Sequence, residues 1–341
     1  MAAITQYLEI ILDGADLTFE QADDLLDRVF DGGVVDVQIA AFLAAMRIKK
    51  ATPMELAGLA HSLRKHAVKV KVDVENLIDT CGTGGAKVKL FNVSTAAALV
   101  AAGAGVHVAK HGNRGITSKS GSADVLTELG VKIDVSPDVV AECIKRAGIG
   151  FMFAPLFHPA MKFVQPIRKS LDFRTAFNIL GPLANPASVT AQVLGISDES
   201  LMERIAEALK ILGTKHAMIV HSHGLDEIST AGPTKICTLK DNEITTTELN
   251  PGDYGIPLTT LDSLRSDDAA ASAGIIKDIL QGKQTGAAKD IVLLNAAAAI
   301  IVGGAANDFA SAIKIADNSI KDGMAMDCLE KLIKISNSNI N

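Results

Sequence analysis

Three segments of the chain hold residues that could bind phosphate groups and a divalent cation. In the first, a glycine-rich turn spans residues 82–85 (GTGG), and residues 92–95 (NVST) follow at the expected start of an alanine-rich helix. Glycine lets backbone N–H groups approach an anion, and a helix N-terminus offers further free N–H groups. The turn is neither a P-loop nor a GxGxxG motif, because no GKS or GKT follows it and position 87 is Lys. A plain strand–turn–helix corner is the alternative, but the hydroxyls of Ser94 and Thr95 favour a phosphate site.

The second segment follows an expected strand at 106–110 and is rich in groups that bind anions. Its residues are Lys110, His111, Gly112, Asn113 and Arg114, then Thr117, Ser118, Lys119, Ser120, Gly121 and Ser122. Cationic side chains and hydroxyls at this density suit a di- or triphosphate. An exposed polar loop is the alternative, and for His111 a structural role is as compatible with the pattern as a chemical one.

The third segment contains two adjacent carboxylates, Asp226 and Glu227, just after an expected strand at 217–221. Such a pair can hold Mg²⁺ between water and substrate phosphates. The nearby His221 and His223 could indicate zinc, but two histidines without a third are a weak zinc pattern. A solvated acidic turn is the other alternative. A phosphate-rich cleft needs a cation, and this favours Mg²⁺.

The pattern of elements changes near residue 74. Before it, short amphipathic helices begin at capping signals such as those at residues 18–21 (TFEQ) and 52–55 (TPME). After it, strands and helices alternate, which is typical of βαβ units and a mostly parallel sheet. We expect strands at 77–81, 106–110, 131–135, 193–196 and 217–221, a hairpin at 235–250 that turns at Asp241 and Asn242, and helices at 137–147, 199–212, 265–280 and 287–303, with one more helix closing the chain.

The sequence therefore predicts an α/β protein with a small N-terminal α-helical domain and a larger α/β domain around a mostly parallel central sheet. We expect the helical domain at 1–73, with part of 160–186 packing on it, and the α/β domain at 74–341. Ligands in open α/β sheets sit outside the carboxyl ends of the strands. The three segments are therefore expected to meet in one cleft.

Composition excludes several classes of protein. The 341 residues carry a formal charge of −6, which argues against a nucleic-acid-coating role, since that would need a basic surface. The longest apolar run, 291–306, is interrupted by Asn295 and is shorter than the ~20 residues of a membrane span. No secretory signal is visible, and four scattered cysteines form no disulfide pattern. We expect a cytoplasmic globular protein that binds neither nucleic acid nor membrane.

An ordered set of motifs across nearly the whole chain resembles the anthranilate phosphoribosyltransferase family. The motifs are DTCGTGG, FNVST, KHGNR, SKSGSADVL, HPAMK, IRK, FNILGPLANP and HGLDE. The resemblance implies a tryptophan-pathway enzyme that joins anthranilate to 5-phosphoribosyl 1-diphosphate (PRPP) and releases pyrophosphate, with Mg²⁺ as cofactor. It also implies the fold shared with pyrimidine nucleoside phosphorylases, and a homodimer through the helical domains.

The resemblance also implies roles for individual residues. The metal ligands would be Ser94, Asp226 and Glu227, and the anthranilate contacts would be Gly82, Asn113 and Arg168. The PRPP site would comprise Gly82, Gly85, Ala86, Leu90, Asn92, Val93, Ser94, Thr95, Lys110, His111, Gly112, Asn113, Arg114, Ser118 and Ser122. A guanidinium at Arg168 can grip a carboxylate with two hydrogen bonds, although a surface salt bridge is the alternative. The anthranilate amine is neutral at pH 7, so no acid–base residue is assigned, and catalysis would rest on positioning and charge from Lys110, Asn113 and Arg168.

Two positions depart from the family pattern. Ala86 stands where the family has Asp after GTGG, and Leu90 stands where it has Thr. The missing carboxylate would touch PRPP or its metal ion, so PRPP affinity or metal stoichiometry is expected to differ.

Two other functions stay open. A pyrimidine nucleoside phosphorylase would use the same fold, but Arg168 suits a substrate carboxylate better than a neutral base. A non-catalytic relative could bind nucleic acid through the phosphate loop, but the charge of −6 and the acidic pair argue against it.

Overall fold

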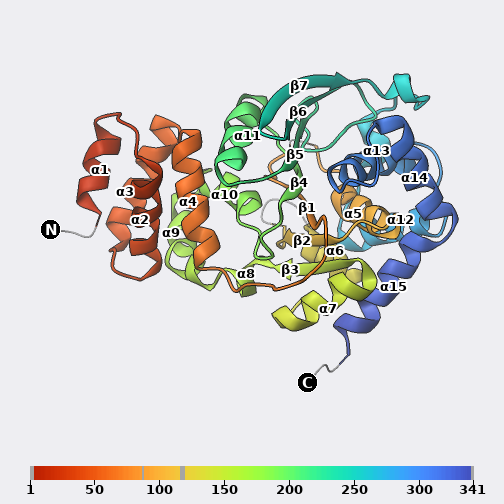
Figure 1. The fold of residues 1–341 in the computed structure, drawn as a ribbon, viewed down its shortest axis with the longest axis horizontal. Helices are drawn as coiled ribbons and strands as arrows, with labels where there is room; N and C mark the ends of the chain where they lie inside the picture. Colours follow the sequence, from red (N-terminus) through yellow and green to blue (C-terminus); the bar gives the residue numbers. More distant parts are fainter. Residues whose placement is uncertain (1–3, 87, 116–119, 339–341) are drawn as a thin grey trace.

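The structure is a computed structural model that describes residues 4–86, 88–115 and 120–338. A small helical bundle lies at one end of the molecule, and a larger α/β part makes up the rest (Figure 1). The bundle contains α1 (Thr5–Leu12), α2 (Phe19–Phe30), α3 (Asp36–Lys49) and α4 (Pro53–Lys65). Both expected capping boxes form, at the starts of α2 and α4. The apolar face of each helix is buried in the bundle.

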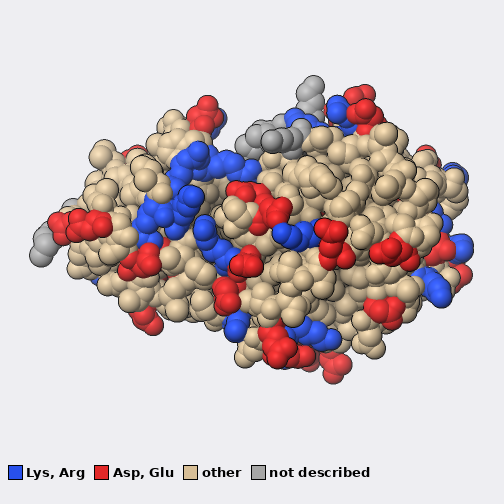
Figure 2. Space-filling view, turned by 90° about the horizontal axis from the view of Figure 1, so that it is seen from above, with Lys and Arg blue, Asp and Glu red and all other residues tan. Residues whose placement is uncertain are grey.

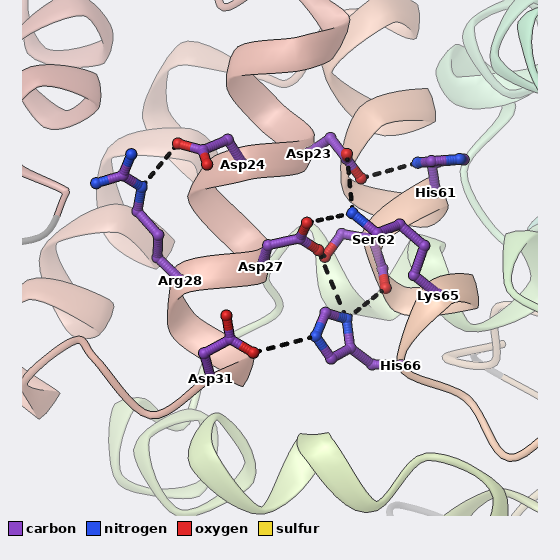
Figure 3. A network of polar contacts seen from close by, with 9 residues as sticks. All are labelled: Asp23, Asp24, Asp27, Arg28, Asp31, His61, Ser62, Lys65 and His66. Carbon is purple, nitrogen blue, oxygen red and sulfur yellow. Dashed lines mark hydrogen bonds and ion pairs between the residues drawn. The ribbon is translucent and has the colours of Figure 1, made fainter.

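Helices α2 and α4 are in close contact because α4 carries Gly58, where a Cβ atom would lie 2.4 Å from the Phe19 carbonyl oxygen. Polar side chains join the two helices beside this contact (Figure 3). Asp23 Oδ1 lies 2.9 Å from His61 Nδ1, and the Ser62 hydroxyl donates to Asp27 Oδ1 at 2.6 Å. These contacts hold α2 and α4 together.

The larger part is built on a seven-stranded sheet. Its strands are β1 (Ile78–Gly82), β2 (Val108–Gly112), β3 (Ile149–Phe153), β4 (Ala191–Gly195), β5 (His216–His221), β6 (Thr234–Lys240) and β7 (Glu243–Leu249). The order is β3-β2-β1-β4-β5-β6-β7, with the first five strands parallel and β6 and β7 antiparallel. The expected mostly parallel sheet and the hairpin are confirmed. Asp241 and Asn242 both have positive φ, as a two-residue hairpin turn requires.

Helices cover the sheet and continue to the C-terminus (Figure 1). They are α5 (Val93–Gly103), α6 (Ser122–Glu128), α7 (Pro137–Ala147), α8 (Ala154–Phe157), α9 (Gln165–Leu171), α10 (Phe177–Leu183), α11 (Met202–Ile211), α12 (Ala269–Leu280), α13 (Ala287–Val302), α14 (Phe309–Lys321) and α15 (Met324–Ser336). Short 3-10 turns are η1 (Pro159–Phe163), η2 (Glu199–Leu201), η3 (Pro251–Tyr254) and η4 (Leu261–Leu264). Helix α5 is buried along almost its whole length and packs against α13, α14 and α15.

The segment from α8 to α10 connects the two parts of the molecule. Helix α9 packs on α3, and α10 packs on α4. Val164, Ile167 and Leu180 share one apolar cluster with the helices of the bundle. The side chains of this segment are therefore held between the bundle and the sheet.

The structure corrects several sequence-based expectations. Residues 131–135 are not a strand: Val131 and Ile133 are buried, but the Lys132 N–H donates to the Ser336 hydroxyl at 3.1 Å and no strand pairs with this segment. The helix expected over the last twenty-odd residues is α15, whereas α14 before it was not expected, and α12 begins only at Ala269. Strand β3 was not expected. In the described part of the chain, no helix combines the length and apolar character that crossing a membrane requires.

Candidate active site

The carboxyl ends of β1 and β4 leave room for Asp226 because both strands end in glycine. Gly82 and Gly195 lie opposite each other in the parallel pair. A Cβ atom on Gly82 would lie 2.7 Å from Asp226 Oδ2, and one on Gly195 would lie 1.8 Å from the Asp226 carbonyl oxygen. Asp226 belongs to the loop after β5, on the far side of β4. This loop therefore crosses the end of β4 and reaches β1.

Lys110 brings a buried positive charge to the same edge of the sheet. Its side chain is only 1% exposed and reaches from β2 to β1, where Nζ donates to the Thr80 carbonyl oxygen at 2.5 Å and to the Thr80 hydroxyl at 3.3 Å. Nζ also lies 3.4 Å from Ser94 Oγ in the first turn of α5. Lys110 therefore links two strands to the N-terminus of α5.

Lys110, Asp226 and Glu227 form a charged cluster at the strand ends, and burial shifts the pKa of each of them. Burial raises the pKa of Glu227 well above its usual range, the neighbouring charge of Asp226 raises it further, and Lys110 opposes both effects. Burial also raises the pKa of Asp226, while hydrogen bonds from the amides of Asp226 and Gly84 oppose the rise. Burial lowers the pKa of Lys110. Ionising both carboxyls here is costly, and a divalent cation between them would offset that cost.

A cavity of about 20 Å³ lies within the cluster, lined by residues that include Thr80, Ser94, Asp226, Glu227 and Asn295. That is room for a single water molecule or ion. Its hard oxygen donors suit Mg²⁺. Over residues 4–86, 88–115 and 120–338 no three His, Cys, Asp or Glu side chains gather as a metal site. A cation would thus need the Ser94 hydroxyl or substrate oxygens besides the two carboxylates.

The zinc alternative gains no support from the histidines near the acidic pair. His221 ends β5, and its Nδ1 lies 2.9 Å from the carbonyl oxygen of Ile196. His223 is exposed on the following turn. The two rings thus have different surroundings, and among the described residues neither forms a group of three potential metal ligands with the carboxylates.

The N-terminus of α5 is capped by Asn92. Asn92 Oδ1 accepts the Thr95 N–H at 3.0 Å and the Ser94 hydroxyl at 3.3 Å, while Nδ2 donates to the Ser120 carbonyl oxygen at 3.4 Å. The Ser94 amide hydrogen-bonds Glu227 and so opposes the rise that burial causes in the pKa of that carboxyl. The helix N-terminus therefore joins the acidic pair to the second polar loop.

The second polar loop is closed by Asp124. Its carboxylate accepts the N–H groups of Gly115 and Gly121 at 2.9 and 3.1 Å and forms an ion pair with Arg114 Nη1 at 2.9 Å. Asn113 Oδ1 accepts the Arg114 N–H at 2.8 Å. Arg114 thus has its own counter-charge, and the loop is less cationic than its composition indicates.

His111 takes part in a buried polar network. Its N–H donates to Asp79 Oδ1 at 3.2 Å, and Asn185 Nδ2 donates to Asp79 Oδ2 at 2.8 Å. The His111 ring lies 4.9 Å from the ring of His158, and burial lowers the pKa of His111. The bond to Asp79 comes from the backbone N–H of His111, so of these contacts only the ring contact with His158 involves the imidazole itself, and both roles that the sequence left open remain.

Arg168 stands on α9, between the bundle and the sheet. Its guanidinium lies 5.5 Å from the centre of the Phe177 ring, and Nη1 donates to Gln165 Oε1 at 3.4 Å. Burial lowers the pKa of Arg168. No carboxylate of the described residues forms an ion pair with it, so the guanidinium is available for an acidic ligand.

The structure thus places most of the expected site residues in two groups and leaves several others outside them. One group, at the carboxyl ends of the strands, comprises Gly82, Asn92, Val93, Ser94, Thr95, Lys110, Asp226 and Glu227. A second, where β2 leads into α6, comprises Gly112, Asn113, Arg114 and Ser122. Gly85, Ala86 and Leu90 lie in the connection between β1 and α5, and Arg168 contacts neither group directly. Ser118 and Lys87 lie outside the described residues.

Sequence reasoning missed four residues of this region. Thr80 holds Lys110, Gly195 admits Asp226, Asn295 lines the cavity and Arg174 contacts the glycine-rich loop. Two of them could have been found in the sequence, because Asn295 interrupts an apolar helix and Gly195 ends a buried strand. Thr80 and Arg174 could not, since their contacts depend on the folded chain.

Comparison with known proteins gives the family. Residues 5–67 match the helical bundle domain of a glycosyl transferase family, and residues 74–326 match its a/b domain. The anthranilate phosphoribosyltransferase of Methylobacillus flagellatus is 47% identical over 331 residues, which cover 96% of this chain and 97% of the relative.

Solved structures agree with the sequence comparison. The crystal structure of anthranilate phosphoribosyltransferase from Thermus thermophilus is 35% identical, with a TM-score of 0.93 over 99% of this chain and 100% of that one. The Saccharomyces cerevisiae enzyme in complex with PRPP and Mg is 29% identical, with a TM-score of 0.89 over 98% of both chains. On these grounds, the chain belongs to the anthranilate phosphoribosyltransferase family.

Proposed function

We propose that this chain transfers the 5-phosphoribosyl group of PRPP to the amine of anthranilate, giving N-(5-phosphoribosyl)anthranilate and pyrophosphate. The observation that carries the proposal is the cluster at the strand ends, where Lys110 and Ser94 face the carboxylates of Asp226 and Glu227. A fixed cation beside a carboxylate pair suits a substrate that loses pyrophosphate. The family relationship supports the same reaction.

The PRPP end of the proposed site lies at the glycine-rich loop, the N-terminus of α5 and Lys110. Mg²⁺ held by Ser94, Asp226 and Glu227 would neutralise charge on the pyrophosphate. Thr80 fixes the ammonium group of Lys110 in advance, so this charge needs little reorganisation when the C1–oxygen bond breaks. Asn92 holds the first turn of α5 in the same way.

The anthranilate end of the proposed site contains Arg168. A half-buried guanidinium without a carboxylate partner among the described residues can form two charge-assisted hydrogen bonds with the anthranilate carboxylate. Because the aromatic amine is neutral at pH 7, its attack on C1 needs orientation and no strong base. Asn113, at the end of β2, is the proposed second contact.

A fluorescence assay of anthranilate consumption tests the function directly. The purified chain, with PRPP and Mg²⁺, should consume anthranilate and release pyrophosphate, and omission of either PRPP or Mg²⁺ should stop the reaction. Phosphorolysis of thymidine or uridine, measured in parallel, tests the nucleoside phosphorylase alternative. Phosphorolysis without anthranilate consumption would overturn the proposal.

We also propose a homodimer through the helical bundle and a division of the chain at 73/74. Large apolar side chains on the bundle surface support the dimer: Val35, Val37 and Ile48 are 65%, 79% and 83% exposed. Packing of α9 on α3 and of α10 on α4 supports assigning part of 160–186 to the bundle. Light scattering after size-exclusion chromatography tests the homodimer and should give twice the chain mass.

The cytoplasmic location stays a prediction, in line with four free cysteines.

A further inference from the structure

Arg174, between α9 and α10, lies against the outer side of the glycine-rich loop. Its Nη1 donates to the Gly84 carbonyl oxygen at 3.2 Å, and its Nη2 donates to the Thr83 and Gly84 carbonyl oxygens at 3.4 and 3.3 Å. A Cβ atom on Gly85 would lie 1.6 Å from Arg174 Nη1. A side chain at position 85 would therefore displace the guanidinium of Arg174, and the φ of +86° at Gly85 independently favours glycine.

These hydrogen bonds, together with the one that the Ser197 hydroxyl donates to the Gly84 carbonyl oxygen at 3.1 Å, fix where the loop amides point. A trans peptide is planar, so the carbonyl oxygen of one residue and the N–H of the next point in opposite directions. With the Thr83 and Gly84 carbonyls turned toward Arg174, the N–H groups of Gly84 and Gly85 point away from it. The Gly84 amide hydrogen-bonds the carboxylate of Asp226, which agrees with this orientation.

The helical bundle holds Arg174 in place. Arg47, in the last turn of α3, donates a hydrogen bond from Nη1 to the carbonyl oxygen of Arg174. The Arg47 guanidinium also lies 5.0 Å from the centre of the Phe173 ring. Figure 2 shows lysine and arginine side chains gathered on the surface where the bundle meets the larger part of the molecule. A continuous set of contacts thus runs from α3 through Arg174 to the loop and Asp226.

We propose that Arg174 is a positioning residue, which turns the amides of the glycine-rich loop toward the site and couples that loop to the helical bundle. The inference rests on the proposed function, because it assigns the loop amides to the diphosphate of PRPP. Arg174 contributes through the peptide groups of Thr83 and Gly84. Arg168, on the same connecting segment, instead faces the proposed anthranilate end, so the two arginines serve different substrates.

The test compares Arg174→Ala, Arg174→Lys and Arg47→Ala with the unaltered chain. Arg146→Gln, an exposed arginine on α7 that pairs with Glu142, is the matched control. PRPP binding is measured by calorimetry in the presence of Mg²⁺, the KM of each substrate is measured by the anthranilate assay, and thermal unfolding reports on folding. Loss of hydrogen bonds from a charged donor should weaken PRPP binding about 10- to 100-fold in Arg174→Ala. The KM of anthranilate should stay within about twofold, because Arg168 is unchanged.

Arg174→Lys should recover part of the PRPP affinity, because an ammonium group can donate to one carbonyl but lacks the planar fork. Arg47→Ala should shift PRPP affinity in the same direction by less, and Arg146→Gln should leave it unchanged. PRPP binding that is equal in all variants would overturn the inference. So would an equal rise of both KM values with a lower unfolding temperature, since that indicates a purely structural role. An unaltered chain that binds no PRPP would overturn the proposed function as well.

Discussion

Asn295 binds both backbone polar groups of Ile228, the residue directly after Glu227. Asn295 Oδ1 accepts the Ile228 N–H at 2.9 Å, and Nδ2 donates to the Ile228 carbonyl oxygen at 2.8 Å. Asn295 is 5% exposed and belongs to α13, an otherwise apolar helix. The polar residue that interrupts the longest apolar run of the sequence therefore fixes the loop that carries the acidic pair.

Replacement of this asparagine should affect both stability and metal dependence. Asn295→Ala leaves the buried Ile228 N–H without a partner, which should lower the free energy of unfolding by about 1–3 kcal/mol. It should also raise the Mg²⁺ concentration needed for half-maximal activity, because the backbone next to Glu227 loses its anchor. Chemical denaturation and a Mg²⁺ titration measure the two effects. Asn318→Ala, at an exposed position of α14, is the control. An unchanged Mg²⁺ requirement would show that Asn295 serves stability alone.

The acidic pair should be important for activity and costly for stability. Because burial raises the pKa of both carboxyls, the folded chain binds their protons more tightly than the unfolded chain, and ionisation at pH 7 opposes folding. Asp226→Asn with Glu227→Gln should therefore unfold at the same or a higher temperature. Its kcat/KM should fall by at least about 100-fold, since metal-ion charge stabilisation is worth several kcal/mol. Near-normal turnover at limiting Mg²⁺ would contradict the metal assignment.

Arg168 should determine the affinity for anthranilate. In Arg168→Ala one substrate loses a charge-assisted contact worth about 2–3 kcal/mol, so kcat/KM for anthranilate should fall roughly 30- to 150-fold. The KM of PRPP should change much less. Lys169→Ala, which removes an exposed charge from the same helix, is the control for the non-specific electrostatic effect of removing a positive charge from α9. Equal effects of Arg168→Ala on both substrates would indicate a structural role.

Acid should destabilise the protein through His158. Burial, with help from the charges of His111 and Lys69, lowers the pKa of His158 to about 3. The unfolded chain therefore binds this proton more readily. The contribution of His158 to stability is complete above pH 6.5 and is lost as pH falls toward 3, at about 1.4 kcal/mol per pH unit.

His158→Phe keeps a ring beside His111 and removes the titrating group. The free energy of unfolding, measured by urea denaturation between pH 7 and pH 4.5, should then depend less steeply on pH than in the unaltered chain. His223→Asn, at an exposed position with positive φ, should keep the original slope. Equal slopes for all three proteins would show that His158 does not titrate in this range.

The sequence allowed the sheet and the loops after β1, β2 and β5 to be predicted, because short apolar runs there end at glycine or polar residues. The hairpin was predictable from Asp241 and Asn242, which tolerate positive φ. Strand β3 could not be predicted from the sequence. Only Gly148 separates its first residue, Ile149, from helix α7, so no polar break marks where the helix ends and the strand begins. Alternation at 131–135 indicated a strand, but those apolar residues pack on helices and form no ladder.

The site was predictable where its chemistry is carried by local motifs and not where it depends on distant contacts. As an adjacent pair of carboxylates, Asp226 and Glu227 indicate the proposed metal site in the sequence itself, whereas Gly195 matters only because Asp226 lies against it. Arg174 looks like one more cation in a basic segment until the fold places it against Gly85. Residues whose roles consist of orienting another segment leave no pattern of their own.

Helix α5 bears on the order in which the site forms during synthesis. Its first turn carries Ser94, but its sides are covered by α13, α14 and α15, and the Ser319 hydroxyl donates to the Val100 carbonyl oxygen at 2.8 Å. Because α5 ends at Gly103 and α13 begins only at Ala287, the ribosome releases α5 long before the helices that enclose it. Until those helices emerge, the apolar sides of α5 stay uncovered and open to chaperones. The end of the site that we propose for PRPP should thus be among the last parts of the molecule to form, although residues 82–95 are made well before the helices that cover α5.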